Sequence, residues 1–230
     1  MPLPVLPLFP TGFHFRPRAA LFDLDGTLVR TFIDFPAMRR EMQALSARLG
    51  AGEATAPLDD ILEIVAAMAQ TLGGEPGETA RRDAYALLEA MEADGCAHPE
   101  RIEGSSELLS QLRGERGARV GIITRNCRRV SEALLARMDL PHDILIARED
   151  TTEFKPHPAP VLLACARLGV DPAEATMTGD LWADIAAGSA AGVRATIGLQ
   201  WPHDPPLRFA RHPPDFTVGS VTEATTLLLG

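Results

Sequence analysis

Ala19-Ala20-Leu21-Phe22-Asp23-Leu24-Asp25-Gly26-Thr27 is an apolar run that ends in two acids, a glycine and a threonine. Side chains alternate between faces along an extended strand, so Asp23 and Asp25 should point the same way. Gly26 lets the backbone leave the strand, and Thr27 can hydrogen-bond back to it. Two like charges about 4 Å apart repel by roughly 4 kcal/mol at an effective dielectric constant near 20. A shared proton, a cation or a lysine must offset that repulsion.

Three later segments carry groups that can do so. They are an apolar strand ending in a hydroxyl, a lone lysine and a further pair of acids: Val120–Asn126, Phe154-Lys155-Pro156 and Thr178–Asp184. In this order the four segments resemble the haloacid dehalogenase superfamily, in particular its phosphoglycolate phosphatase-like branch with a helical cap, over roughly residues 18–200. The first segment is the most specific, since Asp-x-Asp-Gly-Thr should occur by chance at about 1 in 10⁵ positions. The other three depend on their order and spacing.

Composition narrows the class of protein. The 230 residues are 46% hydrophobic, which is enough for one large domain or two smaller ones. The net charge of −9 argues against nucleic acid or membrane partners, so an anionic substrate needs a local positive site. Cys96, Cys127 and Cys165 are widely spaced and predict no disulfide framework, which fits the cytoplasm. No apolar run reaches the ~18 residues of a transmembrane helix.

Strand and helix patterns alternate over most of the chain. This predicts an α/β fold, a doubly wound parallel sheet covered on both faces, which the resemblance identifies as a Rossmann-like core. The expected strands are 18–23, 118–123, 143–147, 175–178, 193–197 and 215–218, and the expected helices are 104–113, 128–138, 158–168, 182–191 and 220–229. Chemistry collects at the carboxyl ends of such strands. The residues that fall at or just after predicted strand ends are Asp23, Thr124, Lys155 and Asp180.

Residues 34–100 interrupt this alternation. Helical spacing of apolar residues predicts helices over 36–49, 58–72 and 77–93, separated by Gly50–Gly52 and Gly73–Gly77. We therefore expect a core domain formed by 18–33 and 101–230 with an inserted all-helical cap domain at 34–100, which the resemblance implies closes over the site. Residues 1–17, with four prolines in the first ten and no basic start, are expected to form an irregular extension rather than a signal peptide.

The resemblance implies specific roles for the acids. Asp23 is the expected nucleophile, and Asp25 the acid that protonates the leaving oxygen and then the base that activates water. Mg²⁺ is the expected cofactor, held by the Asp23 carboxylate, the Asp25 backbone carbonyl and the Asp180 carboxylate. Asp184 lies one helical turn from Asp180 and should orient Lys155 or a metal-bound water.

The resemblance also implies how the phosphate is held. Lys155 should neutralise phosphate and nucleophile together, while Thr124 should hydrogen-bond a phosphoryl oxygen. Taken singly, each site residue has a structural explanation. These are a helix cap for Asp23, Asp25, Thr124 and Asp180, an exposed helix position for Asp184, and a solvated loop for Lys155. Four matches in the expected order, each at a predicted strand end, favour the catalytic interpretation.

Asp25 discriminates between reactions, because the family's dehalogenases lack this second aspartate. Its presence favours phosphoryl transfer, and the absence of lysine from residues 29–117 argues against a Schiff-base phosphonatase. We therefore expect a phosphatase acting on a phosphoglycolate-like compound, a sugar phosphate or a nucleotide monophosphate. A phosphomutase and a non-catalytic phospho-ligand binder remain as alternatives, and the chain is expected to be a monomer or homodimer.

Substrate recognition is expected from four residues. Arg39, Arg40 and Arg125 can hold a substrate carboxylate or second phosphate, with Asn126 beside them, although solvated arginines are the plainer explanation. Immediately after the first segment the chain has Leu28–Thr31, where the branch tends to show Leu-Val-Asp-Ser. The stretch 201–206 and the stretch 212–214 are expected to be surface loops, and Trp182 to pack.

Overall fold

The computed structural model describes residues 16–114, 117–204 and 208–229. These form two compact units, one from residues up to 30 and from 100 onward, the other from residues 31–99. The expected N-terminal extension falls almost wholly outside the described residues.

A six-stranded parallel sheet forms the core of the larger unit. Its order is β5-β4-β1-β6-β7-β8, with β1 Ala19–Phe22, β4 Arg119–Ile123, β5 Ile144–Ile146, β6 Ala175–Gly179, β7 Ala195–Leu199 and β8 Phe216–Val218. All five pairings are parallel, and β1 lies between β4 and β6. The strands β1, β6 and β7 are buried along their whole length, as strands covered on both faces must be. All six expected strands are confirmed.

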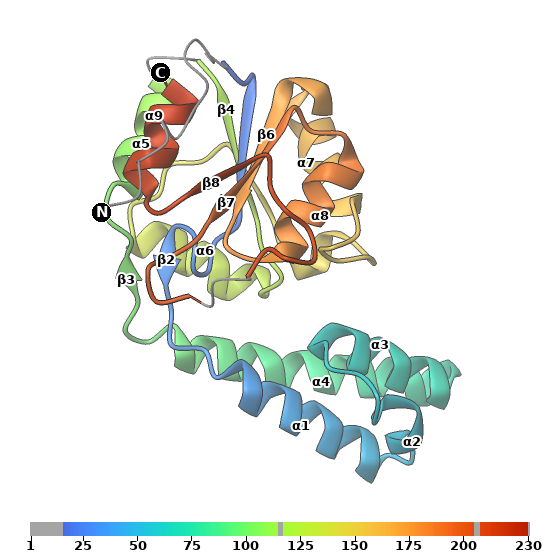
Figure 1. Ribbon diagram of the computed structural model, residues 1–230. Coiled ribbons are helices and arrows are strands. Elements are labelled where there is room, and N and C mark those ends of the chain that lie inside the picture. Colours follow the sequence, from blue (N-terminus) through green and yellow to red (C-terminus); the bar gives the residue numbers. More distant parts are fainter. Residues whose placement is uncertain (1–15, 115–116, 205–207, 230) are drawn as a thin grey trace, which may run out of the picture. The chain divides into compact units, whose positions relative to one another are not determined.

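Helices cover both faces of this sheet. Figure 1 shows α5 (Ser105–Gly114) and α9 (Val221–Leu229) on one face, and α7 (Ala159–Leu168) and α8 (Trp182–Ala191) on the other. Helix α6 (Arg128–Arg137) follows β4. From β1 the chain winds outward to β4 and β5, then returns to β6 and winds the other way. The topological switch therefore lies between β1 and β6, and the expected doubly wound α/β fold is confirmed.

A short antiparallel ribbon, absent from the sequence-based prediction, lies beside the links to the second unit. It pairs β2 (Val29–Arg30) with β3 (Glu100–Arg101). Two-residue strands show no hydrophobic period that a sequence pattern could reveal.

The second unit is helical, with α1 (Phe35–Arg48), α2 (Gly52–Thr55), α3 (Ile61–Leu72) and α4 (Gly74–Gly95). Side chains of Asp34 and Asp60 cap α1 and α3. A linker was expected over Gly73–Gly77, but only Gly73 separates α3 from α4. The prediction is wrong for the other residues of this stretch, because α4 already begins at Gly74. Proline is tolerated in a first helical turn, where its missing N–H has no partner to lose.

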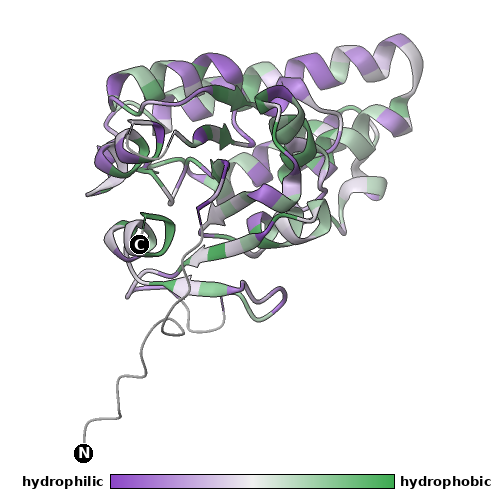
Figure 2. Cartoon of the chain, turned by 90° about the horizontal axis from the view of Figure 1, so that it is seen from above, coloured by the Kyte–Doolittle hydropathy of each residue, from purple (hydrophilic) through white to green (hydrophobic). Residues whose placement is uncertain are grey.

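Hydrophilic and hydrophobic segments alternate along the helices, consistent with one buried and one exposed face (Figure 2). Within the described ranges, no helix combines the length and apolar character needed to cross a membrane.

Candidate active site

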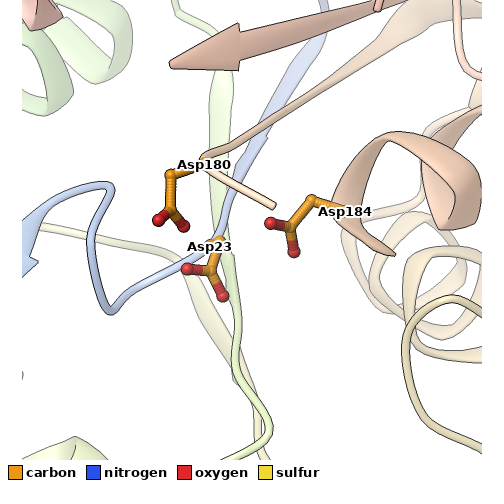
Figure 3. Close-up of side chains that lie close together, drawn as sticks. All are labelled: Asp23, Asp180 and Asp184. Carbon is orange, nitrogen blue, oxygen red and sulfur yellow. The ribbon is translucent and has the colours of Figure 1, made fainter. Parts of the chain in front are cut away.

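Three carboxylates converge at the carboxyl edge of the sheet. Asp23 follows β1, Asp180 follows β6 across the topological switch, and Asp184 lies in the first turn of α8. One ligand atom from each lies within 4.8 Å of the others, and all three residues are buried. Figure 3 shows the three carboxylates facing a common point. The parallel pairing of β1 with β6 produces this convergence, because it aligns Phe22 with Thr178 just before the acids.

The turn after Asp23 is shaped by Gly26. Its φ of +78° is a left-handed conformation, and a Cβ there would overlap the Asp180 carboxylate. The backbone is closed by a Gly26 N–H bond to the Val29 carbonyl at 2.8 Å. The Thr27 hydroxyl lies 3.5 Å from both Asp23 Oδ2 and Asp180 Oδ1. These two oxygens therefore face the same side of the turn.

Lys155, the only lysine in the chain, is buried beneath the acids. Its Nζ donates to Asp23 Oδ1 at 2.5 Å and to the Ile123 carbonyl at 2.7 Å, and it lies 2.6 Å from Asp184 Oδ1. An ammonium group has three donors, and all three have acceptors here. The arrangement binds one oxygen of Asp23 and leaves Oδ2 on the side of Asp180.

Asp184 is held from both sides. Its Oδ1 contacts Lys155, while Oδ2 accepts the Leu181 N–H at 3.0 Å in the first turn of α8. A Cβ on Gly179 would overlap the Asp184 side chain, so the glycine lets this acid lie against the end of β6. Asp184 thus contacts Lys155 directly while its other oxygen is fixed by the first turn of α8.

Burial and repulsion from neighbouring carboxylates raise the proton affinity of Asp23 and Asp180. Burial, reinforced by the Asp184 and Asp180 charges, raises the pKa of Asp23 well above its ordinary range despite the attraction of Lys155. Burial also raises the pKa of Asp180 to about 7, with Asp184 adding to the shift and Arg208 opposing it. Burial alone would lower the pKa of Lys155, but the charges of Asp184 and Asp23 outweigh it and raise the pKa. A cation bound among these acids would lower the raised pKa values of both Asp23 and Asp180.

Asp25 lies beside the end of β4. Its Oδ2 accepts a hydrogen bond from Asn126 Nδ2. The Asn126 backbone N–H donates to the Thr124 hydroxyl at 3.2 Å, and both side chains are buried. Of the expected site residues, Asn126 thus contacts Asp25, and Thr124 contacts Asn126.

The arginines expected to bind substrate are divided between the units. Arg125 is half-buried in the larger unit and its carbonyl accepts from Arg148 at 3.4 Å. Arg39 and Arg40 lie in α1 of the helical unit, where Arg39 pairs with Asp59 at 3.1 Å.

The loop between β7 and β8 supplies two residues that the sequence-based analysis missed. Trp201 Nε1 donates to the Gly26 carbonyl at 2.8 Å, and Arg208 binds both the backbone carbonyl and the carboxylate of Asp180. The expected loop is present over the described residues 201–204, but Trp201 is half-buried there and hydrogen-bonded to the turn after Asp23. Trp182 packs as expected, stacked on His212 with ring centroids 5.8 Å apart.

The donor set fits a hard divalent cation. The cluster offers carboxylate oxygens alone, and the paired Asp23 Oδ2 and Asp180 Oδ1 are both left facing the Thr27 hydroxyl after Lys155 has taken Asp23 Oδ1. Mg²⁺ prefers such ligands and usually retains several waters.

Comparisons with known proteins find related hydrolases. Residues 17–192 match a hydrolase family described as haloacid dehalogenase-like hydrolase. An N-acetylmuramic acid 6-phosphate phosphatase of Pseudomonas putida is 33% identical over 204 residues, covering 83% of this chain and 88% of the relative. A phosphoglycolate phosphatase of Nitrosococcus oceani is 29% identical over 221 residues, covering 93% and 97%. A superfamily hydrolase of subfamily IA, variant 1, from Geobacter sulfurreducens shares the fold, with a TM-score of 0.57, 22% identity and coverage of 94% and 98%.

Proposed function

Because this chain belongs to the haloacid dehalogenase-like hydrolases, we propose that it is a Mg²⁺-dependent phosphatase acting on a phosphate monoester of a small metabolite. The membership confirms the superfamily and the class of enzyme, a hydrolase, that the four sequence segments indicate. The observation that carries the proposal is the buried convergence of Asp23, Asp180 and Asp184 around Lys155.

The reaction proceeds in two steps through a phosphoaspartyl intermediate. The Asp23 carboxylate attacks phosphorus, the bond from phosphorus to the leaving oxygen breaks, and Asp25 gives that oxygen a proton. Water then attacks phosphorus, Asp25 takes the water's proton, and inorganic phosphate leaves with the Asp23 carboxylate restored. The hydrogen bond from Asn126 holds Asp25 in place for both transfers.

Charge at the reacting centre is balanced by two cations. The Asp23 and Asp180 carboxylates and the Asp25 backbone carbonyl would hold Mg²⁺, which when bound neutralises the approaching phosphate dianion. Lys155 fixes Asp23 Oδ1, and Asp184 in turn fixes Lys155. The Thr124 hydroxyl accepts the Asn126 N–H, and its own proton is directed to a phosphoryl oxygen.

Arg125 of the larger unit holds an acidic group of the substrate, since arginine suits bidentate binding of carboxylate or phosphate. The names of the two curated relatives each specify a phosphate ester of an acid, which motivates this choice.

Phosphate release tests the proposal. Full-length protein is assayed with p-nitrophenyl phosphate, phosphoglycolate and N-acetylmuramic acid 6-phosphate, with Mg²⁺ or with EDTA. We expect EDTA to stop turnover, Mg²⁺ to restore it, and Asp23→Asn to lower it by at least about 10³-fold.

Asp171→Asn is the matched control. Asp171 caps a short 3-10 helix at the surface through a bond from Ala173 N at 2.9 Å, and asparagine caps equally well. Turnover that survives in Asp23→Asn, or that ignores chelation, contradicts the assigned nucleophile or the metal.

A further inference from the structure

An arginine of the β7–β8 loop contacts an acid of the proposed cation site. Arg208 donates through Nε to the Asp180 backbone carbonyl and through Nη2 to Asp180 Oδ2. Its Nη1 donates to Asp204 Oδ1 at 2.6 Å. Because one planar group is held by three acceptors, its position is well defined, with 21% of the side chain exposed.

The same loop is attached to the turn that follows the nucleophile. Asp204 Oδ2 accepts the Trp201 N–H at 2.9 Å, and Trp201 Nε1 donates to the Gly26 carbonyl at 2.8 Å. Hydrogen bonds therefore run without a break from Gly26 through Trp201, Asp204 and Arg208 to Asp180. The loop links the backbones of two active-site turns that are far apart in the sequence.

Different cations pair with the different aspartates of the cluster. Lys155 forms ion pairs with Asp23 and Asp184, and its third donor goes to a backbone carbonyl. Among the described residues, the ion pair of Asp180 is formed with Arg208 instead. Each of the three acids therefore has a cationic partner within the protein, and that of Asp180 comes from the loop.

A divalent cation bound by Asp180 would share that carboxylate with a guanidinium. Like charges within about 5 Å repel by several kcal/mol at an effective dielectric constant near 20. The loop arginine must therefore oppose binding of the metal.

We propose that Arg208 is a positioning residue that acts as an internal counter-cation of Asp180 and competes with divalent metal for it. This inference rests on the proposed function, because it concerns the same cation site. Arg208 lowers the metal affinity of the acid cluster and stabilises the protein when metal is scarce.

Titration calorimetry with MgCl₂ tests the competition without any assay of turnover. Full-length wild type, Arg208→Gln and Arg211→Gln are stripped with EDTA and dialysed before titration. Arg211 is the matched control, because it loses the same charge from the same loop but lies over the Trp182 ring at 4.1 Å. We expect Arg208→Gln to lower the Kd for Mg²⁺ by about tenfold or more, and Arg211→Gln to change it less than about twofold.

Thermal unfolding gives a second measurement. In EDTA, Arg208→Gln should melt below Arg211→Gln, and saturating Mg²⁺ should close that gap. Arg208→Lys keeps the charge and should return the Kd toward the wild-type value, which separates charge from disruption of the loop.

The outcomes separate the two proposals. If wild type binds Mg²⁺ and Arg208→Gln binds it equally or more weakly, the competition is refuted and the metal site stands. If neither protein binds Mg²⁺, the metal-dependent mechanism and this inference both fail.

Discussion

Replacing Asp184 by asparagine should expose how strongly the buried lysine depends on its second carboxylate. Lys155 Nζ lies 2.6 Å from Asp184 Oδ1, and each side chain is only 2% exposed. Asparagine keeps the shape, and its oxygen can still accept the Leu181 N–H. Its amide group then faces the ammonium, so one buried donor loses its acceptor.

The expected loss of stability in Asp184→Asn follows from breaking a buried ion pair. Removing one partner of a buried ion pair costs about 3–5 kcal/mol when the surviving charge is left unpaired. Lys155 keeps Asp23 and the Ile123 carbonyl, so we expect the free energy of unfolding to fall by an amount near the lower end of that range. The whole free energy of unfolding of a typical domain is about 5–15 kcal/mol, so this loss would be a large fraction of it. Solvent is excluded, so the loss should change little between about 0.05 and 1 M salt.

The loss should also be constant across neutral pH as far as Lys155 is concerned. Burial opposes the ammonium, but Asp184 and Asp23 raise the pKa of Lys155 above its ordinary value. When folding raises a lysine pKa, the resulting stability is fully present below the pKa of the unfolded chain, ~10.4. It is lost only as pH rises through the pKa of the folded protein. The relevant window therefore lies above neutral pH.

Urea unfolding in EDTA measures the loss. Both tryptophans, Trp182 and Trp201, lie in the larger unit, so their fluorescence reports its unfolding. Glu174→Gln is the control, because it breaks the exposed Arg18–Glu174 pair of the same unit at 3.1 Å and should cost less than about 1 kcal/mol. The reasoning is refuted if Asp184→Asn unfolds within about 1 kcal/mol of wild type, or if its loss is as sensitive to salt as that of the control.

Three further outcomes are expected. Burial raises the pKa of Asp180 to about 7, so in EDTA the folded state keeps a proton that the unfolded state has lost. As pH rises from about 4 to 7, the free energy of unfolding of wild type should fall by up to about 4 kcal/mol more than that of Asp180→Asn. An equal pH dependence of the two proteins in denaturant unfolding would contradict this. Gly26→Ala should weaken Mg²⁺ binding in calorimetry and lower turnover at least about 10²-fold, because its Cβ overlaps the Asp180 carboxylate. Gly169→Ala, also at positive φ but in open space, should retain both, and equal effects at the two positions would count against the explanation. An amine-reactive ester should label Lys155, the chain's only lysine, slowly in wild type and faster in Asp184→Asn by peptide mass spectrometry; equal rates would contradict the assigned contact.

The sheet and the convergence of the acids were predictable for one physical reason. Parallel strands deliver whatever follows them to one edge, so apolar runs ending in Asp23, Thr124 and Asp180 indicate a shared site before any contact is known. The detailed contacts were less accessible. Lys155 was expected beside the nucleophile, but its hydrogen bond to the Ile123 carbonyl was not foreseen, because backbone acceptors leave no mark in a sequence.

The contacts of the β7–β8 loop could not be predicted, because its sequence has no hydrophobic period that would orient its side chains. Its contacts join residues far apart in the chain, 175 positions between Trp201 and Gly26 and 28 between Arg208 and Asp180. Prolines around Trp201 correctly indicated a loop, but composition does not say which surface a loop covers. The hydrogen bond from the Asn126 amide to Asp25 was not foreseen, because it depends on how the ends of β1 and β4 align.

Trapping the phosphorylated protein tests the account most directly. Asp25→Asn should still accept a phosphoryl group but release it slowly, because the base that activates water is gone. After acid quench of this variant with p-nitrophenyl phosphate and Mg²⁺, peptide mass spectrometry should find one phosphoryl group on Asp23. A phosphoryl group on any other residue, or one that still forms when Asp23 is also replaced by asparagine, would contradict the account.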